Sequence, residues 1–201
     1  KIADRAFYNC RDLAEIIFEE RQQDTVIGWY AFYESGVESL NIPAGVVEIQ
    51  RYAFYGCTGL KELLLPEGLR RIGDYAFYGC TQLKTLTVPS TVNMGGAAFA
   101  NGGITHLELY TNVRYNTSFS PSNIQSIVYH DGVKIVGGLI NCKSLTSVTL
   151  PESVVELEAS AFENCVKLKE IQLPSNLKTI GMNAFRESGI VNVVIPDSVT
   201  F

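Results

Sequence analysis

The sequence has few charged residues, and the basic ones are not gathered in one place. Asp, Glu, Lys and Arg make up 18% of the 201 residues, and the net charge is −5. Nucleic-acid binding needs a basic surface that neutralises phosphates, and no cluster of Lys and Arg provides one. No apolar run approaches the roughly 18 residues of a membrane helix. Neither nucleic-acid binding nor membrane insertion is therefore expected.

Motifs for catalysis and metal binding are also missing. The sequence contains no G-x-S-x-G, no Gly-rich phosphate loop and no H-E-x-x-H. The two histidines, His106 and His130, occupy slots four extended residues apart, about 13 Å, which is too far to share a metal ion. The sequence therefore predicts no catalytic residues, no metal site and no cofactor. An enzyme is the least favoured class.

A repeat of about 23 residues is what the sequence does contain. "IQRYAFYGC" at Ile49–Cys57 returns as "IGDYAFYGC" at Ile72–Cys80. The Phe of the "AF" pair recurs along the chain, and Leu139 takes its slot once. The stretch between Phe99 and Leu139 is expected to hold one complete and one shortened turn. The recurring residues are Phe7, Phe32, Phe54, Phe77, Phe99, Phe162 and Phe185.

Each repeat also carries a strand pattern. Runs such as "LKELLLP" at Leu60–Pro66 and "LKEIQLP" at Leu168–Pro174 alternate apolar and polar residues towards their ends. The proline ends the strand because it lacks an amide donor. One such unit cannot bury its own apolar face, whereas a stack of units can. The repeat therefore predicts a right-handed solenoid with nine parallel strands on one face.

The unit I-x-x-x-A-F-x-x-C-x-x-L-x-x-[IVL]-x-[IVL]-P resembles the BspA-like leucine-rich repeats. This resemblance implies one α/β-type leucine-rich-repeat solenoid over residues 1–201, with short 3₁₀ or irregular turns, or short strands, on the face opposite the main strands. It also implies a place at the cell surface or outside the cell. The pattern departs from the family at residues 19–25, where a polar insert replaces the proline, and at residues 111–123, which lack "AF". The chain opens at Lys1 within the pattern and is expected to be part of a longer protein.

The five cysteines share one slot, three residues after the Phe position. Their spacing contains no C-x-x-C, and stacked turns would place their Cβ atoms in parallel, which suits a disulfide poorly. A shared slot indicates a buried column in which Cys acts as a small apolar residue. Five free, buried thiols are therefore expected at Cys10, Cys57, Cys80, Cys142 and Cys165.

Two surfaces are possible binding sites for a protein or glycan partner. The first is an aromatic group beside the "AF" slots of the N-terminal half, where Tyr and Trp can bury a large area at low entropic cost. The same rings could instead serve only to pack neighbouring turns. The group comprises Trp29, Tyr30, Tyr33, Tyr52, Tyr55, Tyr75 and Tyr78. The second surface is the outward strand face at Glu62, Leu64, Thr85, Thr87, His106 and Glu108.

Two functional classes follow from this pattern. The favoured one is a non-enzymatic recognition module that acts outside the cell. The alternative is a structural spacer that positions other domains and has no ligand of its own. A glycosylation sequon begins at Asn116 in an expected loop.

Overall fold

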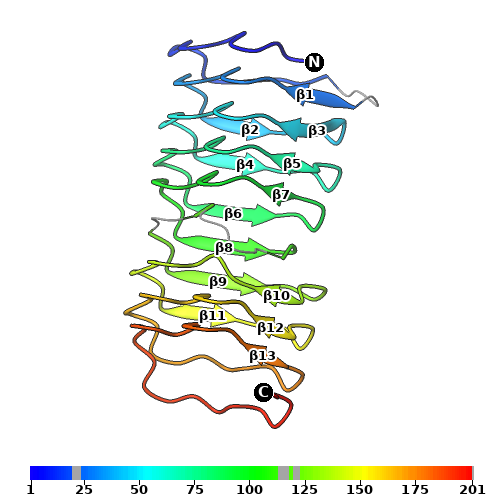
Figure 1. Cartoon of the computed structure of the whole chain (residues 1–201). Coiled ribbons are helices and arrows are strands. Elements are labelled where there is room, and N and C mark those ends of the chain that lie inside the picture. The colour runs from blue at the N-terminus through cyan, green and yellow to red at the C-terminus, as the bar shows by residue number, and fades with distance from the viewer. Residues whose placement is uncertain (20–23, 113–117, 120–122, 201) are drawn as a thin grey trace.

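The chain forms a β-solenoid in which short strands stack in parallel from one end to the other (Figure 1). This computed structural model describes residues 1–19, 24–112, 118–119 and 123–200. One face of the coil, called the strand face below, carries β2 (Ser39–Asn41), β4 (Glu62–Leu64), β6 (Thr85–Val88), β8 (His106–Leu109), β9 (Ser126–Tyr129) and β11 (Ser147–Thr149). The second face carries β1 (Thr25–Ile27), β3 (Val46–Ile49), β5 (Arg71–Ile72), β7 (Asn93–Met94), β10 (Ile135–Val136), β12 (Glu156–Leu157) and β13 (Thr179–Ile180).

Each face divides into two sheets. On the strand face β2 pairs with β4, and a separate sheet runs in the order β11-β9-β8-β6. On the second face the sheets are β1-β3-β5-β7 and β10-β12-β13. All pairs are parallel, and equivalent residues of successive turns lie opposite one another, as with Ser39 and Glu62 or His106 and Ser126. Equivalent positions of the sequence repeat are therefore the residues that pair between neighbouring strands.

A column of stacked phenylalanines forms the centre of the coil. The ring centroids of Phe32, Phe54, Phe77 and Phe99 follow one another at 5.0–5.1 Å, with planes within 4° of parallel. Backbone hydrogen bonds also join the "AF" segments, as from the Phe54 amide to the Ala76 carbonyl at 2.8 Å. These rings are buried, which confirms the predicted stacking of the Phe slot.

The stretch from 111 to 123 contributes a ring that the sequence did not predict. Phe119 is buried and stacks on Phe99 at 5.7 Å, and the Ser118 carbonyl accepts the Phe99 amide at 2.7 Å. "SF" therefore replaces "AF", and both steps from Phe99 to Leu139 are 20 residues long. Residues 113–117, including the sequon at Asn116, lie outside the described residues, as do 120–122 and residues 20–23 of the expected insert.

The α/β expectation is not confirmed, because the described residues form strands, turns and irregular segments and no helix. Residues with positive φ lie two before and two after the "AF" Phe, as with Tyr52 (φ 59°) and Gly56 (φ 69°), and such residues interrupt any helical run. Six strands, not nine, make up the strand face in the described part of the chain. Isolated bridges, Glu15 with Ser39 and Glu170 with Asn192, replace strands near its ends.

Four of the five cysteines are buried and all five are free thiols, but Cys10 is exposed. Three of the buried thiols, those of Cys57, Cys80 and Cys165, donate to the carbonyl of the Phe slot one turn earlier. Cys57 donates to the Phe32 carbonyl at 3.2 Å, and Cys165 donates to the Leu139 carbonyl at 3.4 Å. The expectation of five buried thiols was wrong for Cys10, which is exposed in this structure.

Candidate functional site

The predicted tyrosines form two adjacent columns along the N-terminal turns. Together with Tyr8 they are called the Tyr surface below. The rings of Tyr30, Tyr52 and Tyr75 stack at 4.9 and 5.2 Å. The second column stacks at 4.8, 4.9 and 5.0 Å and contains Tyr8, Tyr33, Tyr55 and Tyr78. Tilted contacts of 5.7–5.8 Å join the two columns within a turn, so the seven rings form one continuous layer.

Stacking covers the ring faces of the Tyr surface but does not bury its side chains completely. The six tyrosines that the sequence singled out are partly buried, whereas the neighbouring Trp29 is half exposed. The guanidinium groups of Arg5 and Arg51 lie 5.4 and 5.5 Å from the centres of the Tyr30 and Tyr52 rings. The rings therefore pack neighbouring turns and remain partly exposed, and partner binding by them stays a prediction.

Two phenols of this surface, Tyr33 and Tyr55, have pKa values raised above the ordinary value, which favours their neutral form. Burial, followed by the negative charge of Glu34, raises the pKa of Tyr33. Burial and the adjacent Tyr78 raise the pKa of Tyr55. A neutral phenol both donates and accepts a hydrogen bond, so the Tyr surface offers regularly spaced polar groups along a rigid aromatic layer.

The second predicted surface is divided by a break in the strand face. Glu62 and Leu64 lie on β4, whereas Thr85 and Thr87 on β6 belong to the next sheet together with β8. Leu64 is 64% exposed, and Glu62 accepts a hydrogen bond from Ser39 at 3.5 Å. These residues lie on one face, as predicted, but not on one continuous sheet.

Two histidines meet at one carboxylate on this face. The Nε2 atoms of His106 and His130 lie 3.6 and 3.3 Å from the two oxygens of Glu108, and the His130 ring stacks on Tyr110 at 3.9 Å. His106 Nδ1 is also hydrogen-bonded to Ser126 Oγ at 2.6 Å. The sequence analysis placed His106 and Glu108 on one face, but it separated the two histidines by strand length and did not predict that both would contact Glu108. No cluster of three or more His, Cys, Asp or Glu able to hold a metal occurs among the described residues.

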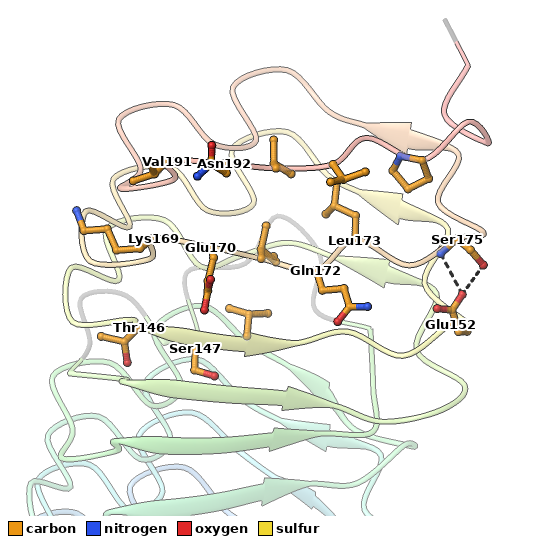
Figure 2. Close-up of a pocket in the computed structure, with 15 residues that line it drawn as sticks. Thr146, Ser147, Glu152, Lys169, Glu170, Gln172, Leu173, Ser175, Val191 and Asn192 are labelled. Atoms are coloured by element: carbon orange, nitrogen blue, oxygen red, sulfur yellow. Dashed lines mark hydrogen bonds between the residues drawn. The ribbon is translucent and has the colours of Figure 1, made fainter.

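A groove on the strand face was missed by the sequence reasoning. It lies beyond β11, has a volume of about 1200 Å³ and is called the C-terminal groove below (Figure 2). Its lining includes Ser147, Val148, Glu170, Ile171, Gln172 and Asn192. The repeat aligns Thr149 with Gln172 and predicts that their strands pair, so no signal in the pattern indicates this opening.

Comparison with known proteins gives a consistent assignment. The sequence matches six copies of the "BspA type Leucine rich repeat region", over residues 1–105, 25–140 and 139–201. No curated protein matches it. No helix in the described part of the chain is long and apolar enough to cross a membrane.

Solved structures of bacterial leucine-rich repeat proteins share the fold. One from Bacteroides ovatus is 26% identical, with a TM-score of 0.78 over 98% of this chain and 52% of its own. One from Eubacterium ventriosum is 20% identical, with a TM-score of 0.59 over 96% of this chain and 69% of its own. The leucine-rich repeat protein of T. pallidum is 22% identical, with a TM-score of 0.52 over 84% of this chain and 71% of its own. This chain thus spans about half the length of the Bacteroides ovatus protein, and it belongs to the family of BspA-type leucine-rich repeat proteins.

Proposed function

We propose that this chain is a non-enzymatic recognition module that acts outside the cell and binds a protein partner through the Tyr surface. One observation carries the proposal: seven tyrosines form a continuous layer of stacked rings, and every one of them remains partly exposed to solvent. Stacking fixes these side chains before a partner arrives, so binding loses little rotamer entropy. Tyrosine also supplies apolar area and a polar tip in the same side chain.

A protein fits this surface better than a glycan. Sugars pack their C–H groups against open aromatic faces, whereas the faces within the Tyr columns are covered by neighbouring rings at about 5 Å. Protein surfaces can pair with ring edges and with regularly spaced hydroxyl groups. The resemblance to surface leucine-rich repeat proteins supports a location outside the cell.

A structural spacer is the second candidate function. The observation that favours it is the same stacking, since continuous Phe and Tyr columns stiffen the coil whether or not a partner binds. A spacer requires rigidity alone and would not depend on the outer edges of the tyrosines.

Binding to immobilised mammalian matrix and plasma proteins separates these functions. We expect the chain to bind at least one of them, and Tyr33→Ser/Tyr55→Ser/Tyr78→Ser to weaken that binding at least about 30-fold, since one hot-spot residue contributes about 2 kcal/mol or more. Tyr110→Ser, at a 38% exposed tyrosine outside the Tyr surface, is the matched control. No binding to any protein of the panel would favour the spacer. Unchanged binding by the triple variant would move the site to the strand face around Glu62 and His106.

A further inference from the structure

The turns on either side of the C-terminal groove are joined around its edges. On the N-terminal side of β11, the Asn141 amide donates to the Glu163 carbonyl, and Asn164 Nδ2 donates to Asn141 Oδ1, both at 2.9 Å. After the strand, the Ser175 amide and hydroxyl donate to Glu152 Oε2 at 3.0 and 2.7 Å (Figure 2). On the second face, β12 and β13 pair in register. The two turns are therefore fixed relative to each other at three places.

Between those places the strand face is open. β11 pairs with β9 on one side, and in the described chain no strand pairs with its other side. Residues 169–173 carry the strand pattern of the next turn. Their only β-pairing is the isolated bridge between Glu170 and Asn192, which lies on the side away from β11. An edge strand presents backbone N–H and C=O groups that another strand can pair with.

The opening reaches the core. In β8 the inward residues Leu107 and Leu109 are fully buried, whereas Val148 and Leu150 of the β11 turn are partly exposed. Core-facing side chains, Val148 and Ile171 among them, line the groove. The groove is thus a gap between two strand segments that extends below the outward side chains.

We propose that the C-terminal groove binds an extended polypeptide segment of a partner, which adds to the edge of β11 as a parallel strand. Backbone groups on β11 would fix the direction and register of the segment, as in other cases of strand addition. About five residues fit alongside 146–150, at about 3.3 Å per residue. Apolar side chains at alternate positions would meet Val148 and Ile171, while Glu170 and Gln172, which extend towards β11 in Figure 2, would lie beside the outward ones.

The segment that fits such a position has the alternation of the chain's own strands. Leu86 and Val88 of "LKTLTVP" (Leu83–Pro89) are the inward residues of β6 and are buried at equivalent positions. A fluorescein-labelled peptide with this sequence is therefore a suitable probe. The controls are a scrambled peptide and one with N-methyl groups at alternate amides, which keeps the side chains but removes backbone donors.

The test combines peptide binding with hydrogen exchange on the intact chain. We expect a saturable rise in fluorescence anisotropy, slower exchange at residues 147–150, and binding at least about tenfold weaker for the N-methylated peptide. No saturable binding, or equal binding of the N-methylated or scrambled peptide, would overturn the proposal. So would protection at β4 and β6 instead of β11. Protection at 147–150 without peptide, together with a dimer in sedimentation, would identify a second copy as the occupant instead.

A charge exchange tests the register of the bound strand. Thr149→Glu places a carboxylate on the edge strand, whereas Val128→Glu places it in the same slot of β9, between β8 and β11. A peptide with Lys at its fifth position should bind Thr149→Glu about two- to fivefold more tightly than one with Glu there, and Val128→Glu should not discriminate between them. Equal discrimination by both variants, or none by Thr149→Glu, would overturn the proposed position. Tyr33→Ser/Tyr55→Ser/Tyr78→Ser should leave peptide binding unchanged, so this groove and the Tyr surface can fail independently.

Discussion

A thiol occupies the same slot in five turns, and its surroundings decide whether it can react. Burial raises the pKa of Cys57 to about 11 and that of Cys165 to about 12. Burial also raises the pKa of Cys80, whereas Cys10 is exposed. Because the thiolate is the reactive form, these three thiols are protected from reagents both by burial and by their raised pKa values.

We predict that a thiol reagent at pH 8 modifies Cys10 alone in the folded chain and all five cysteines after unfolding. Modification of fewer than five cysteines in denaturant without reductant would indicate a disulfide.

The raised pKa values also make the stability of the folded chain depend on pH. A thiol free in the unfolded chain ionises near its ordinary value of 9.0, so the stability that the neutral Cys57 provides is complete below that pH and is lost as pH rises through about 11.

Tyr129 places a polar hydroxyl group in the apolar core. Its ring takes an inward slot that Val88 and Leu109 fill in the two preceding strands, and its hydroxyl has no hydrogen-bond partner among the described residues. Burial raises its pKa, followed by the neighbouring Cys142 and Cys165. We predict that Tyr129→Phe increases the free energy of unfolding by about 1–3 kcal/mol, because it removes an unpaired polar group and keeps the ring. Denaturant unfolding measures this, and a loss of stability would show that the hydroxyl has a partner.

At the scale of the element, turn length is controlled by glycine. Turns with Ser35, Gly102 or Ser188 in the Cys slot are one residue shorter and continue with Gly36, Gly103 or Gly189. The amides of these glycines donate to the Cys-slot carbonyl of the preceding turn at 3.1–3.2 Å. A Cβ at Gly36 would lie 1.9 Å from the Arg11 carbonyl oxygen, which no side chain tolerates. The short turn therefore requires glycine because the backbones approach closely.

We predict that Gly36→Ala destabilises the chain by about 1–3 kcal/mol or more, since the backbone of one turn must move. Gly59→Ala is the matched control, because a Cβ there would meet only ordinary contacts at 3.5 Å and beyond. Thermal unfolding of both variants measures the difference. Equal melting temperatures would mean that the two turns can move apart without cost.

The sequence predicted those elements that repeat, and missed those that depend on contacts between unlike turns. The Phe column, the strand slots and the Tyr columns all follow from periodicity. Phe119 was missed because "SF" does not match the repeated "AF", although its ring meets the same need for burial. The C-terminal groove and the meeting of His106 and His130 at Glu108 depend on local pairing and side-chain direction, which an identical slot in every turn does not encode.

At the scale of the whole molecule, stability should vary along the coil because each turn contacts only its neighbours. Phe77 is buried between Phe54 and Phe99, with 5.1 Å to each. Phe185 is partly exposed and stacks on Phe162 alone at 5.5 Å in the described chain. Removing the first ring leaves a cavity enclosed on both sides, whereas removing the second leaves a site that solvent or the last turn can fill.

We predict that Phe77→Ala lowers the free energy of unfolding by about 3–5 kcal/mol. Phe185→Ala should cost about 1–2 kcal/mol, since less apolar surface is exposed by its removal. Denaturant unfolding gives the two losses in free energy of unfolding. Hydrogen exchange shows which turns of the chain each substitution destabilises. Phe185→Ala should accelerate exchange only in the C-terminal turns, whereas Phe77→Ala should affect turns on both sides of the gap. Equal costs, with uniform changes in exchange, would show that the coil unfolds as one unit and that its stability does not divide by turn.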